Sequence, residues 1–389
     1  MSNLHVLIIG AGMGGLTAAL ALQKNGFKVR VYEQAPELNE IGAGLTISPN
    51  ATRALEYVGL GPFMAEHGDT PSTGALIHYK TGETLTHTQS GGSFKERFGA
   101  EYYQIHRADL HNALAAAVRA NDSDAIILDH VFRNMTQNDS SVTASFTNGV
   151  TARGDILIGA DGARSAVRES IIDEVKVTFT GQVAFRGMVP AADVKRHMTI
   201  ANSAVTMGPG RIFTRYYLRH GELVNVVAIA KTEAWKEEGW SIPATRTDLL
   251  TEYEGWNEDV IGIINALPQD KLFKWALFDR DPIPKWTAGR ATLLGDAAHP
   301  MTPFLGMGAA MALEDGVVIT RCIEKYDTVA NALLAYESAR KKRCKGVLLD
   351  SRKQGLWYQT TDPDEYGSFA STGEMRVPLM GYDPGRVEV

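Results

Sequence analysis

Residues 290–315 read RATLLGDAAHPMTPFLGMGAAMALED, and this stretch decides the fold. The apolar run at residues 291–294 predicts a buried strand, Gly295-Asp296 predicts a tight polar turn, and the small residues from about Gly308 predict a helix. A buried strand that ends in Gly-Asp and leads to a glycine-rich helix start can present backbone amides and one carboxylate to a bound cofactor. His299 lies between them and is followed by a proline, so a structural role is a better interpretation of it than a general base.

The N-terminus carries a second pattern of the same kind. Residues 4–9, 16–24 and 28–33 predict a strand, a helix and a strand, with Gly10-x-Gly12-x-x-Gly15 at the first turn and Glu33 at the end of the second strand. Glycines at this spacing allow a tight turn, let the backbone approach a pyrophosphate and let helix and strand pack closely, while the acid binds ribose hydroxyls. The unit predicts a dinucleotide site but does not separate FAD from NAD(P).

A third pattern is DILIGADGARSAVR at residues 155–168. A buried run delivers Asp161-Gly162 to a turn, and Arg164 and Arg168 follow it. An ordinary Asp-Gly turn before a capped helix would look similar. The two arginines beside the turn favour a role in nucleotide binding instead.

The remaining pattern predicts an α/β fold with two interleaved domains. Helices are expected at residues 50–60, 107–120 and 245–266, strands dominate residues 175–232, a long C-terminal helix covers residues 329–358, and the last residues lack periodicity. We therefore expect a discontinuous Rossmann-like cofactor domain built on a parallel sheet, a mainly β substrate-binding domain inserted into it, and a loosely ordered tail. The expected bounds are 1–72, 100–174 and 280–360 for the cofactor domain, 73–99 and 175–279 for the substrate domain, and 361–389 for the tail.

Composition excludes several classes of protein. The net charge of −6 over 389 residues gives nucleic-acid binding little support, and no apolar run is long enough to predict a membrane span. Two isolated cysteines make neither a disulfide framework nor a metal site, and they fit a cytoplasmic setting. We expect a monomer or homodimer without a metal.

Together, the three motifs resemble those of the single-component FAD-dependent aromatic hydroxylases, which include salicylate, 3-hydroxybenzoate, 4-hydroxybenzoate and 6-hydroxynicotinate hydroxylases. The motifs occur in the family's order, and the resemblance runs over roughly residues 4–350. Smaller matches support it. Residues 40–51 are similar to the family's mobile-flavin loop, residues 106–110 to a helix start whose arginine contacts FAD, and Phe185-Arg186-Gly187 to the strand that enters the substrate sheet.

The resemblance implies an FAD-dependent monooxygenase. In such an enzyme NAD(P)H reduces FAD, the reduced flavin traps O2 as a C4a-hydroperoxide, and one oxygen atom goes to a small phenolic or hydroxypyridine-type aromatic substrate. The FAD-binding residues that it implies are Gly10, Gly12, Gly15, Glu33, Gly42, Ala43, Arg107, Asp161, Gly162, Asp296, Gly306, Gly308 and Ala309. This chain has one GxGxxG with an acid at the right spacing, which agrees with a family that lacks a second nucleotide-binding domain.

The substrate side is expected on the strand-rich region. We expect substrate contacts from Thr46, Arg186, Phe213, Arg215, Tyr216 and Met307, and catalytic contributions from Tyr216, Tyr217 and Pro303. Tyr216 falls where the 6-hydroxynicotinate enzymes place a substrate-side tyrosine. Adjacent strand residues point to opposite faces, so at most one of the two tyrosines should face the cavity. Arg186, Arg211 and Arg215 are the candidates to bind a substrate carboxylate.

Two departures from the family bear on the substrate. Residues 306–310 read GMGAA where many members have Gly-Gln-Gly-Ala-Asn, so Met307 and Ala310 leave an apolar floor under the flavin. Thr46 stands where the 6-hydroxynicotinate enzymes have a histidine. Polar groups of the substrate must then be met from residues 180–230 or from residues 42–50.

Other functions remain open on the sequence alone. A flavoenzyme of the same fold could act as an epoxidase or a reductase on a non-aromatic substrate. An NAD(P)-dependent dehydrogenase or a non-catalytic flavin-binding protein is a further alternative, although the second Asp-Gly turn and the Gly-Asp stretch disfavour the NAD(P) interpretation.

Overall fold

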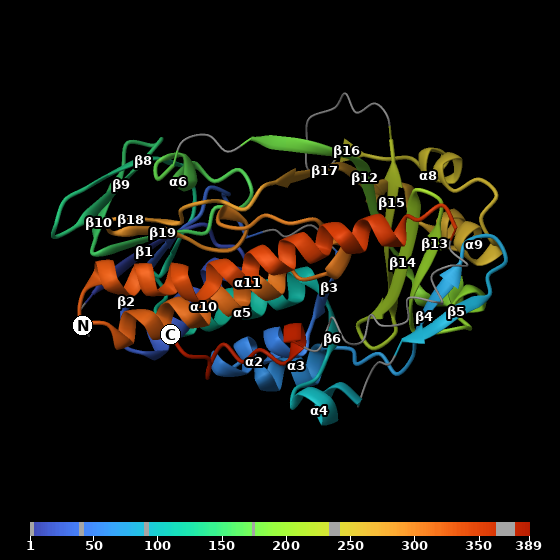
Figure 1. Ribbon diagram of the computed structural model, residues 1–389, viewed down its shortest axis with the longest axis horizontal. Helices are drawn as coiled ribbons and strands as arrows, with labels where there is room; N and C mark the ends of the chain where they lie inside the picture. Colours follow the sequence, from blue (N-terminus) through green and yellow to red (C-terminus); the bar gives the residue numbers. More distant parts are fainter. Residues whose placement is uncertain (1–3, 39–42, 89–92, 173–175, 233–241, 363–377) are drawn as a thin grey trace.

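The computed structural model describes residues 4–38, 43–88, 93–172, 176–232, 242–362 and 378–389. Two sheets lie toward opposite ends of an elongated molecule, and one long helix, α11, runs from one toward the other (Figure 1). We call the six-stranded, mainly parallel sheet "sheet A" and the eight-stranded, mainly antiparallel sheet "sheet B".

Sheet A contains the βαβ unit expected at the N-terminus. β1 pairs in parallel with β2 on one side and with β11 on the other, and β11 pairs in parallel with β19. The carboxyl ends of these strands therefore meet at one edge, where the expected cofactor motifs follow them. The strands in spatial order are β18 (Thr287–Ala288), β19 (Ala291–Leu293), β11 (Ile156–Gly159), β1 (His5–Ile9), β2 (Lys28–Tyr32) and β7 (Ile126–Ile127).

Apolar helices complete the core around sheet A. α1 (Met13–Lys24) packs against α10 (Gly308–Lys325) and α5 (Arg107–Asn121), and α10 packs against α11 (Val329–Tyr358). Residues 13–22 of α1 are all buried, so this helix runs through the interior. The predicted helix at residues 329–358 is confirmed with both of its ends.

Sheet B is built from the strand-rich middle of the chain and from one earlier hairpin. The hairpin β4–β5 joins it through a parallel pairing of β4 with β13. The strands in spatial order are β16 (Ile242–Pro243), β17 (Phe273–Arg280), β12 (Val177–Pro190), β15 (Leu223–Lys231), β14 (Arg211–Leu218), β13 (Ser203–Gly208), β4 (Gly74–His78) and β5 (Thr84–Thr88).

One face of sheet B is covered by two short helices. α8 (Arg246–Glu252) and α9 (Glu258–Ala266) bring Tyr253 and Ile263 onto the buried Phe213. The sequence predicts one helix over residues 245–266. The structure has two, because the Asn257 side chain accepts from the amides of Asp259 and Val260 and starts a new helix there.

The remaining elements include a three-stranded sheet and the pair β3–β6. The three-stranded sheet lies next to sheet A, at the end of the molecule away from sheet B (Figure 1). The bounds are β3 (Gly44–Ile47), β6 (Tyr103–His106), β8 (Phe132–Gln137), β9 (Val142–Phe146), β10 (Thr151–Gly154), α2 (Pro49–Tyr57), α3 (Gly61–His67), α4 (Ser93–Phe98), α6 (Ala166–Glu169), α7 (Ala191–Val194), η1 (Lys195–His197), η2 (Gln269–Lys271), η3 (Gly295–Ala297) and η4 (Pro303–Leu305).

The C-terminal segment differs from expectation. Residues 378–389 pack beside α2 and α10 instead of forming a loose tail, and Met380 is buried (Figure 1). Within the described residues, none of the helices combines the length and the apolar character that a membrane span requires.

Candidate functional site

A cavity of about 510 Å³ lies between the two sheets. On one side it meets the turns that follow β1, β11 and β19, and on the other it meets the strands of sheet B. The expected site residues that line it are Gly12, Gly15, Thr46, Arg107, Gly162, Arg186, Tyr216, Asp296, Pro303, Gly306, Met307, Gly308 and Ala309. Residues more than 290 positions apart in the sequence therefore share one cavity, as Gly12 and Gly308 do.

The N-termini of two helices can bind FAD, one at its phosphates and the other at its ring. α1 begins after Gly12 and α10 begins after Met307, and neither N-cap residue gives a side-chain hydrogen bond to its helix. The first amides of a helix without such a cap need another acceptor, and they carry a partial positive charge. Since Gly12–Gly15 and Gly308–Ala309 line the cavity, these amides can bind phosphate oxygens and the oxygen edge of the flavin.

The glycines of the first motif have separate roles in the geometry. Gly10 has φ +105°, and a Cβ there would lie 2.4 Å from the Ala160 oxygen. A Cβ on Gly15 would lie 2.1 Å from the Gly10 oxygen. A Cβ on Gly12 would meet no protein atom within 4 Å, because this residue faces the cavity. Gly10 and Gly15 thus serve packing, and Gly12 leaves room for a bound group.

Asp296 supplies a carboxylate to the cavity. It follows β19 in the turn η3, and its side chain is exposed to the cavity. Burial of the whole site raises the pKa of Asp296, although His299, Arg107 and Arg168 act in the opposite direction. The carboxylate is placed to accept hydroxyl hydrogen bonds from a ribityl chain.

The loops after β11 and β19 are joined by Arg168. Arg168 is 2 % exposed, and its guanidinium donates to the Ala297 and Ala163 oxygens at 3.0 and 2.7 Å. Asp161 points away from the cavity, since its oxygens accept from the Ser165 hydroxyl and the Val167 amide. Its side chain contacts the first turn of α6, whose N-cap residue is Ser165, and of the Asp-Gly pair it is Gly162 that lines the cavity.

Two further residues of the expected FAD set, Glu33 and Ala43, do not line the cavity themselves. Both Glu33 oxygens accept backbone amides, from Ala11 at 2.8 Å and Ala35 at 3.0 Å, so Glu33 holds the glycine turn in place. The Ala43 oxygen accepts from the Arg107 amide at 2.7 Å and so fixes the start of α5. Gly42 lies outside the described residues.

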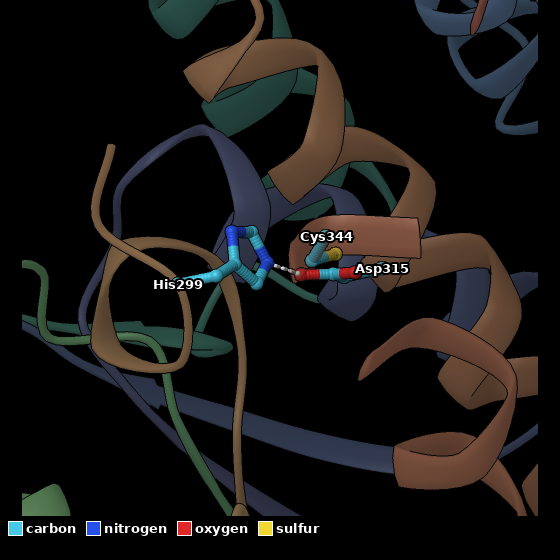
Figure 2. Close-up of side chains that lie close together, drawn as sticks. All are labelled: His299, Asp315 and Cys344. Atoms are coloured by element: carbon cyan, nitrogen blue, oxygen red, sulfur yellow. Dashed lines mark hydrogen bonds and ion pairs between the residues drawn. The ribbon is translucent and has the colours of Figure 1, made fainter. Parts of the chain in front are cut away.

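A buried charge cluster supports the Gly295–Asp296 turn, and Figure 2 shows the hydrogen bond between its members His299 and Asp315. Asp315 of α10 accepts from His299 Nε2 at 2.6 Å, from Arg340 Nε at 2.6 Å and from the Gly295 amide at 3.0 Å. Burial opposes the charge on both groups, but it is outweighed at His299 by Cys344 and Asp315, and at Asp315 by His299 and Arg340. The pKa of His299 is raised well above its ordinary value and the pKa of Asp315 is lowered. His299 is therefore a structural histidine, as expected.

The same cluster brings together His299, Asp315 and Cys344, whose possible ligand atoms lie within 4.8 Å of one another (Figure 2). Both Asp315 oxygens already accept hydrogen bonds, and the neighbouring Arg340 guanidinium would repel a cation. The arrangement therefore fits loop support better than metal binding.

The alternation of β14 selects one tyrosine. Ile212, Thr214 and Tyr216 line the cavity, whereas Tyr217 is packed against the cluster beneath α8 and α9. Phe213 and Arg215, both expected to contact the substrate, lie on the same face of β14 as Tyr217, which is the face away from the cavity. Phe213 packs its ring on Tyr253, and Arg215 is 2 % exposed and donates to the Ala201 oxygen at 2.8 Å. The structure therefore does not place Tyr217, expected to be catalytic, or Phe213 and Arg215, expected to contact the substrate, at the cavity.

One of the three candidate arginines lines the cavity. Arg186 of β12 does so, and its guanidinium lies 4.7 Å from the centre of the Trp275 ring. Arg211 pairs with Glu252 at 2.8 Å on the covered face of the sheet. Arg186 is close enough to Tyr216 to oppose the strong rise that burial causes in the tyrosine's pKa. Tyr216 is therefore a neutral hydroxyl beside a fixed cation.

Asn225 lies beside the cavity residues but is not predicted as a site residue from the sequence. It is fully buried on β15 opposite Tyr216, and its Oδ1 accepts from the Gly44 amide at 2.7 Å. Its Nδ2 is buried without a hydrogen-bond partner among the described residues. A Cβ on Gly44 would lie 2.5 Å from the Tyr216 hydroxyl oxygen, so this glycine lets β3 approach the tyrosine. Alternation from Tyr216 predicts the lining residues Thr214 and Ile212, but no local signal marks Asn225.

Comparison with known proteins agrees with this geometry. The family described as "FAD binding domain" matches residues 3–351. 6-Hydroxynicotinate 3-monooxygenase of Pseudomonas fluorescens is 32% identical over 364 residues, 92% of each chain. 3-Hydroxybenzoate 6-hydroxylase of Polaromonas naphthalenivorans is 34% identical over 362 residues, 92% of this chain and 88% of the relative.

Solved structures give the same result. Klebsiella pneumoniae HpxO complexed with FAD and uric acid superposes with a TM-score of 0.86 at 27% identity, covering 97% of this chain and 96% of that chain. A salicylate hydroxylase substrate complex gives 0.85 at 25% identity, covering 99% and 97%. With the cavity, the uncapped helix starts and the Gly-Asp turn, these likenesses establish that the chain belongs to the FAD-binding-domain family, among the FAD-dependent aromatic hydroxylases.

Proposed function

We propose that this enzyme hydroxylates a small aromatic ring that carries both a hydroxyl and a carboxylate group, of the phenolic or hydroxypyridine type. The observation that carries the proposal is the pairing of Tyr216 and Arg186 on the cavity face of sheet B. A neutral tyrosine hydroxyl can donate to a substrate phenolate, and a guanidinium can bind a carboxylate through two parallel hydrogen bonds. The relatives named above act on 6-hydroxynicotinate and 3-hydroxybenzoate, which have both groups.

Bound FAD, reduced by NAD(P)H, supplies the activation of O2 from which one oxygen atom reaches the ring. The chain's own part is to bind, orient and exclude water. Apolar side chains of sheet B enclose the ring, since Ile212, Val227 and Ile229 line the cavity beside Tyr216. A dry wall of this kind strengthens the polar contacts inside it and keeps water from the reacting atoms.

Tyr216 and Arg186 set the orientation of the ring. Tyr216 is 5 % exposed and packs against Gly44 of β3 and Asn225 of β15. These contacts restrict the positions that its hydroxyl can take. Hydrogen bonding to a substrate oxygen favours the deprotonated phenol, whose ring carbons are richer in electrons. A carboxylate on Arg186 then fixes which carbon faces the flavin.

Gly306 and Met307, which line the cavity just before α10, contribute shape more than polarity. Met307 is 2 % exposed and accepts a hydrogen bond at its sulfur from the Ser48 hydroxyl at 3.5 Å. Gly306 has φ +65°, and a Cβ there would lie 2.8 Å from the Thr46 Oγ1. This tight, apolar floor agrees with a planar substrate whose polar groups point toward sheet B. Pro303 begins the turn η4 before it and contributes a rigid part of the wall.

A substrate screen with matched compounds tests the proposal. 3-Hydroxybenzoate, benzoate and phenol would be offered with NADH or NADPH, and NAD(P)H oxidation would be measured together with hydroxylated product. We expect product from the compound that has both groups and a strong loss of product when either group is absent. Product formation from phenol as efficient as from 3-hydroxybenzoate would reject the role of Arg186. Consumption of NAD(P)H without product from every hydroxylated aromatic acid would reject the function.

We also propose a cytoplasmic setting. Cys322 and Cys344 are the two cysteines of the chain, and both are buried and free. Extracellular proteins commonly use their cysteines in disulfides, so this usage supports a reducing compartment.

A further inference from the structure

We propose that Leu379 and Met380, from the C-terminal segment, form a wall of the cavity at the FAD, and that Tyr382 holds them there. Both residues line the cavity, although they lie more than 60 positions beyond the last of the cofactor motifs. This proposal rests on one part of the proposed function, namely that FAD binds in the cavity. Its test uses FAD binding and needs no substrate.

The segment is anchored through its backbone oxygens. Arg53 of α2 donates to the Met380 and Tyr382 oxygens at 3.1 and 3.3 Å, and Arg343 of α11 donates to the Leu379 oxygen at 2.8 Å. Farther along, Arg321 of α10 donates to the Pro384 oxygen at 2.8 Å. Side chains from three helices thus fix a stretch that has little regular structure of its own.

Tyr382 connects the segment to buried charges. Its ring centre lies 3.9 Å from the Arg343 guanidinium and 5.3 Å from that of Arg340. A cation over an aromatic ring at these distances is an attractive contact, and it strengthens where water is excluded. The two arginines are themselves fixed, because both pair with the fully buried Glu314, at 2.6 and 2.8 Å.

The same glutamate reaches the start of α2. Asn50 donates to Glu314 at 2.6 Å, and it lies two residues after Ser48, which lines the cavity. Through Glu314 the segment therefore shares its anchor with the two helix starts that border the cavity, those of α2 and α10. The segment contacts α2, α10 and α11, and α10 packs against α1 and against the Gly295–Ala297 turn, both of which follow strands of sheet A. The segment therefore borders the cavity on the side where the FAD motifs lie.

Thiol labelling tests the position of the wall. The natural cysteines are fully buried, so Met380→Cys introduces one thiol that reaches the cavity. In the apoprotein this thiol should react with a maleimide, and FAD should slow the reaction at least tenfold. Arg386→Cys is the matched control, because Arg386 belongs to the same segment and its side chain is 89% exposed. Its labelling should not respond to FAD. An equal rate at position 380 with and without FAD, or protection by 3-hydroxybenzoate in place of FAD, would overturn the proposal.

Flavin affinity tests the anchor. Tyr382→Ala should raise the FAD dissociation constant of the apoprotein at least fivefold, measured by quenching of flavin fluorescence, and Arg386→Ala should leave it unchanged. Removal of residues 378–389 should have a larger effect. If the truncated chain does not fold, as judged by circular dichroism, the labelling experiment and the Tyr382 variant still decide the question. A folded Tyr382→Ala protein with unchanged FAD affinity would refute the anchoring role.

Discussion

Asn225 and Gly44 lie 181 residues apart in the sequence, and yet the Gly44 amide donates to the Asn225 Oδ1 at 2.7 Å. The Gly44 amide can only donate, so the oxygen of the carboxamide must face it, and the NH2 group must face elsewhere. This contact holds β3 against sheet B at the point where Tyr216 enters the cavity.

Asn225→Ala should therefore loosen β3 and the substrate site together. Loss of the acceptor leaves a buried amide unsatisfied, which costs about 1–3 kcal/mol. We expect a lower melting temperature and a larger fraction of NAD(P)H oxidised without product, while FAD content stays close to that of the parent protein. Asn225→Asp keeps the acceptor oxygen and serves as the control for the Gly44 contact. Unchanged coupling in the alanine variant would remove Asn225 from the site.

Tyr216→Phe tests the hydroxyl that we assign to substrate binding. A hydrogen bond to a charged group contributes about 1.5–3 kcal/mol, which corresponds to roughly 10- to 150-fold in kcat/KM. We expect a loss in that range with FAD binding unchanged. Tyr217→Phe is the matched control, because Tyr217 faces away from the cavity and its loss should have little effect. The reverse ranking of the two variants would contradict the assignment.

Asp296→Ala should weaken FAD retention more than it alters the choice of substrate. The carboxylate faces the cavity at the end of β19, and its removal takes away an acceptor for ribityl hydroxyls. The measurement is the flavin content of the purified protein and the FAD dissociation constant. Full flavin occupancy in this variant would count against the role of Asp296.

Gly12 and Gly15 should respond differently to the same substitution. Gly15→Ala places a Cβ 2.1 Å from the Gly10 oxygen, so it should destabilise the fold. Gly12→Ala meets no protein atom within 4 Å and should fold normally, but its methyl group enters the space of the FAD pyrophosphate. Thermal unfolding of the two apoproteins and titration with FAD distinguish these effects. A Gly12→Ala protein with unaltered FAD affinity would show that the pyrophosphate lies elsewhere.

The His299–Asp315 pair predicts a pH dependence of stability. The pKa of His299 is raised above its ordinary value of 6.5, so its contribution is complete below pH 6.5 and is lost as the pH rises through the folded-state pKa. The pKa of Asp315 is lowered from 3.8, so its contribution is present above pH 3.8 and is lost as the pH falls through the folded-state pKa.

We therefore expect the free energy of unfolding to decrease above pH 6.5, by at most about 1.4 kcal/mol per pH unit from this one group. His299→Gln should remove that component of the slope. Chemical denaturation of both proteins between pH 6 and 9 provides the comparison, and identical slopes would mean that His299 does not change its protonation on unfolding.

Local patterns in the sequence were sufficient for much of the framework. The helix at residues 329–358 and the glycine turn at Gly10–Gly15 follow from periodicity and from spacing, which depend on neighbouring residues. Alternation along β14 also predicts that either Tyr216 or Tyr217, but not both, faces the cavity. Which tyrosine does so depends on the face of sheet B that α8 and α9 cover, and this is a contact between distant residues. The expectation that Phe213 and Arg215 contact the substrate is wrong because both lie on the covered face.

Contacts between distant residues could not be predicted in this way. The aperiodic C-terminus gave no indication that Leu379 and Met380 reach the cavity, because the arginines that fix them lie on α2 and α11. The pattern around Asp161 predicts a turn at the cofactor edge, and Gly162 of that turn lines the cavity. The Asp161 side chain accepts instead from the Ser165 hydroxyl and the Val167 amide, which the local pattern does not reveal.

Helix α11 contacts elements of both sheets. Near its start, Glu337 accepts from the Trp286 and Thr287 amides beside sheet A, and near its end Arg352 pairs with Asp279 of sheet B at 2.5 Å. Gly355 then lies against the Phe304 ring, where a Cβ would be 2.4 Å from the ring carbon. A continuous helix of 30 residues is about 45 Å long and resists bending, so it acts as a strut that sets the distance between the sheets. The spacing of the two sheets, and with it the width of the cavity between them, is therefore set in part by one helix that contacts both.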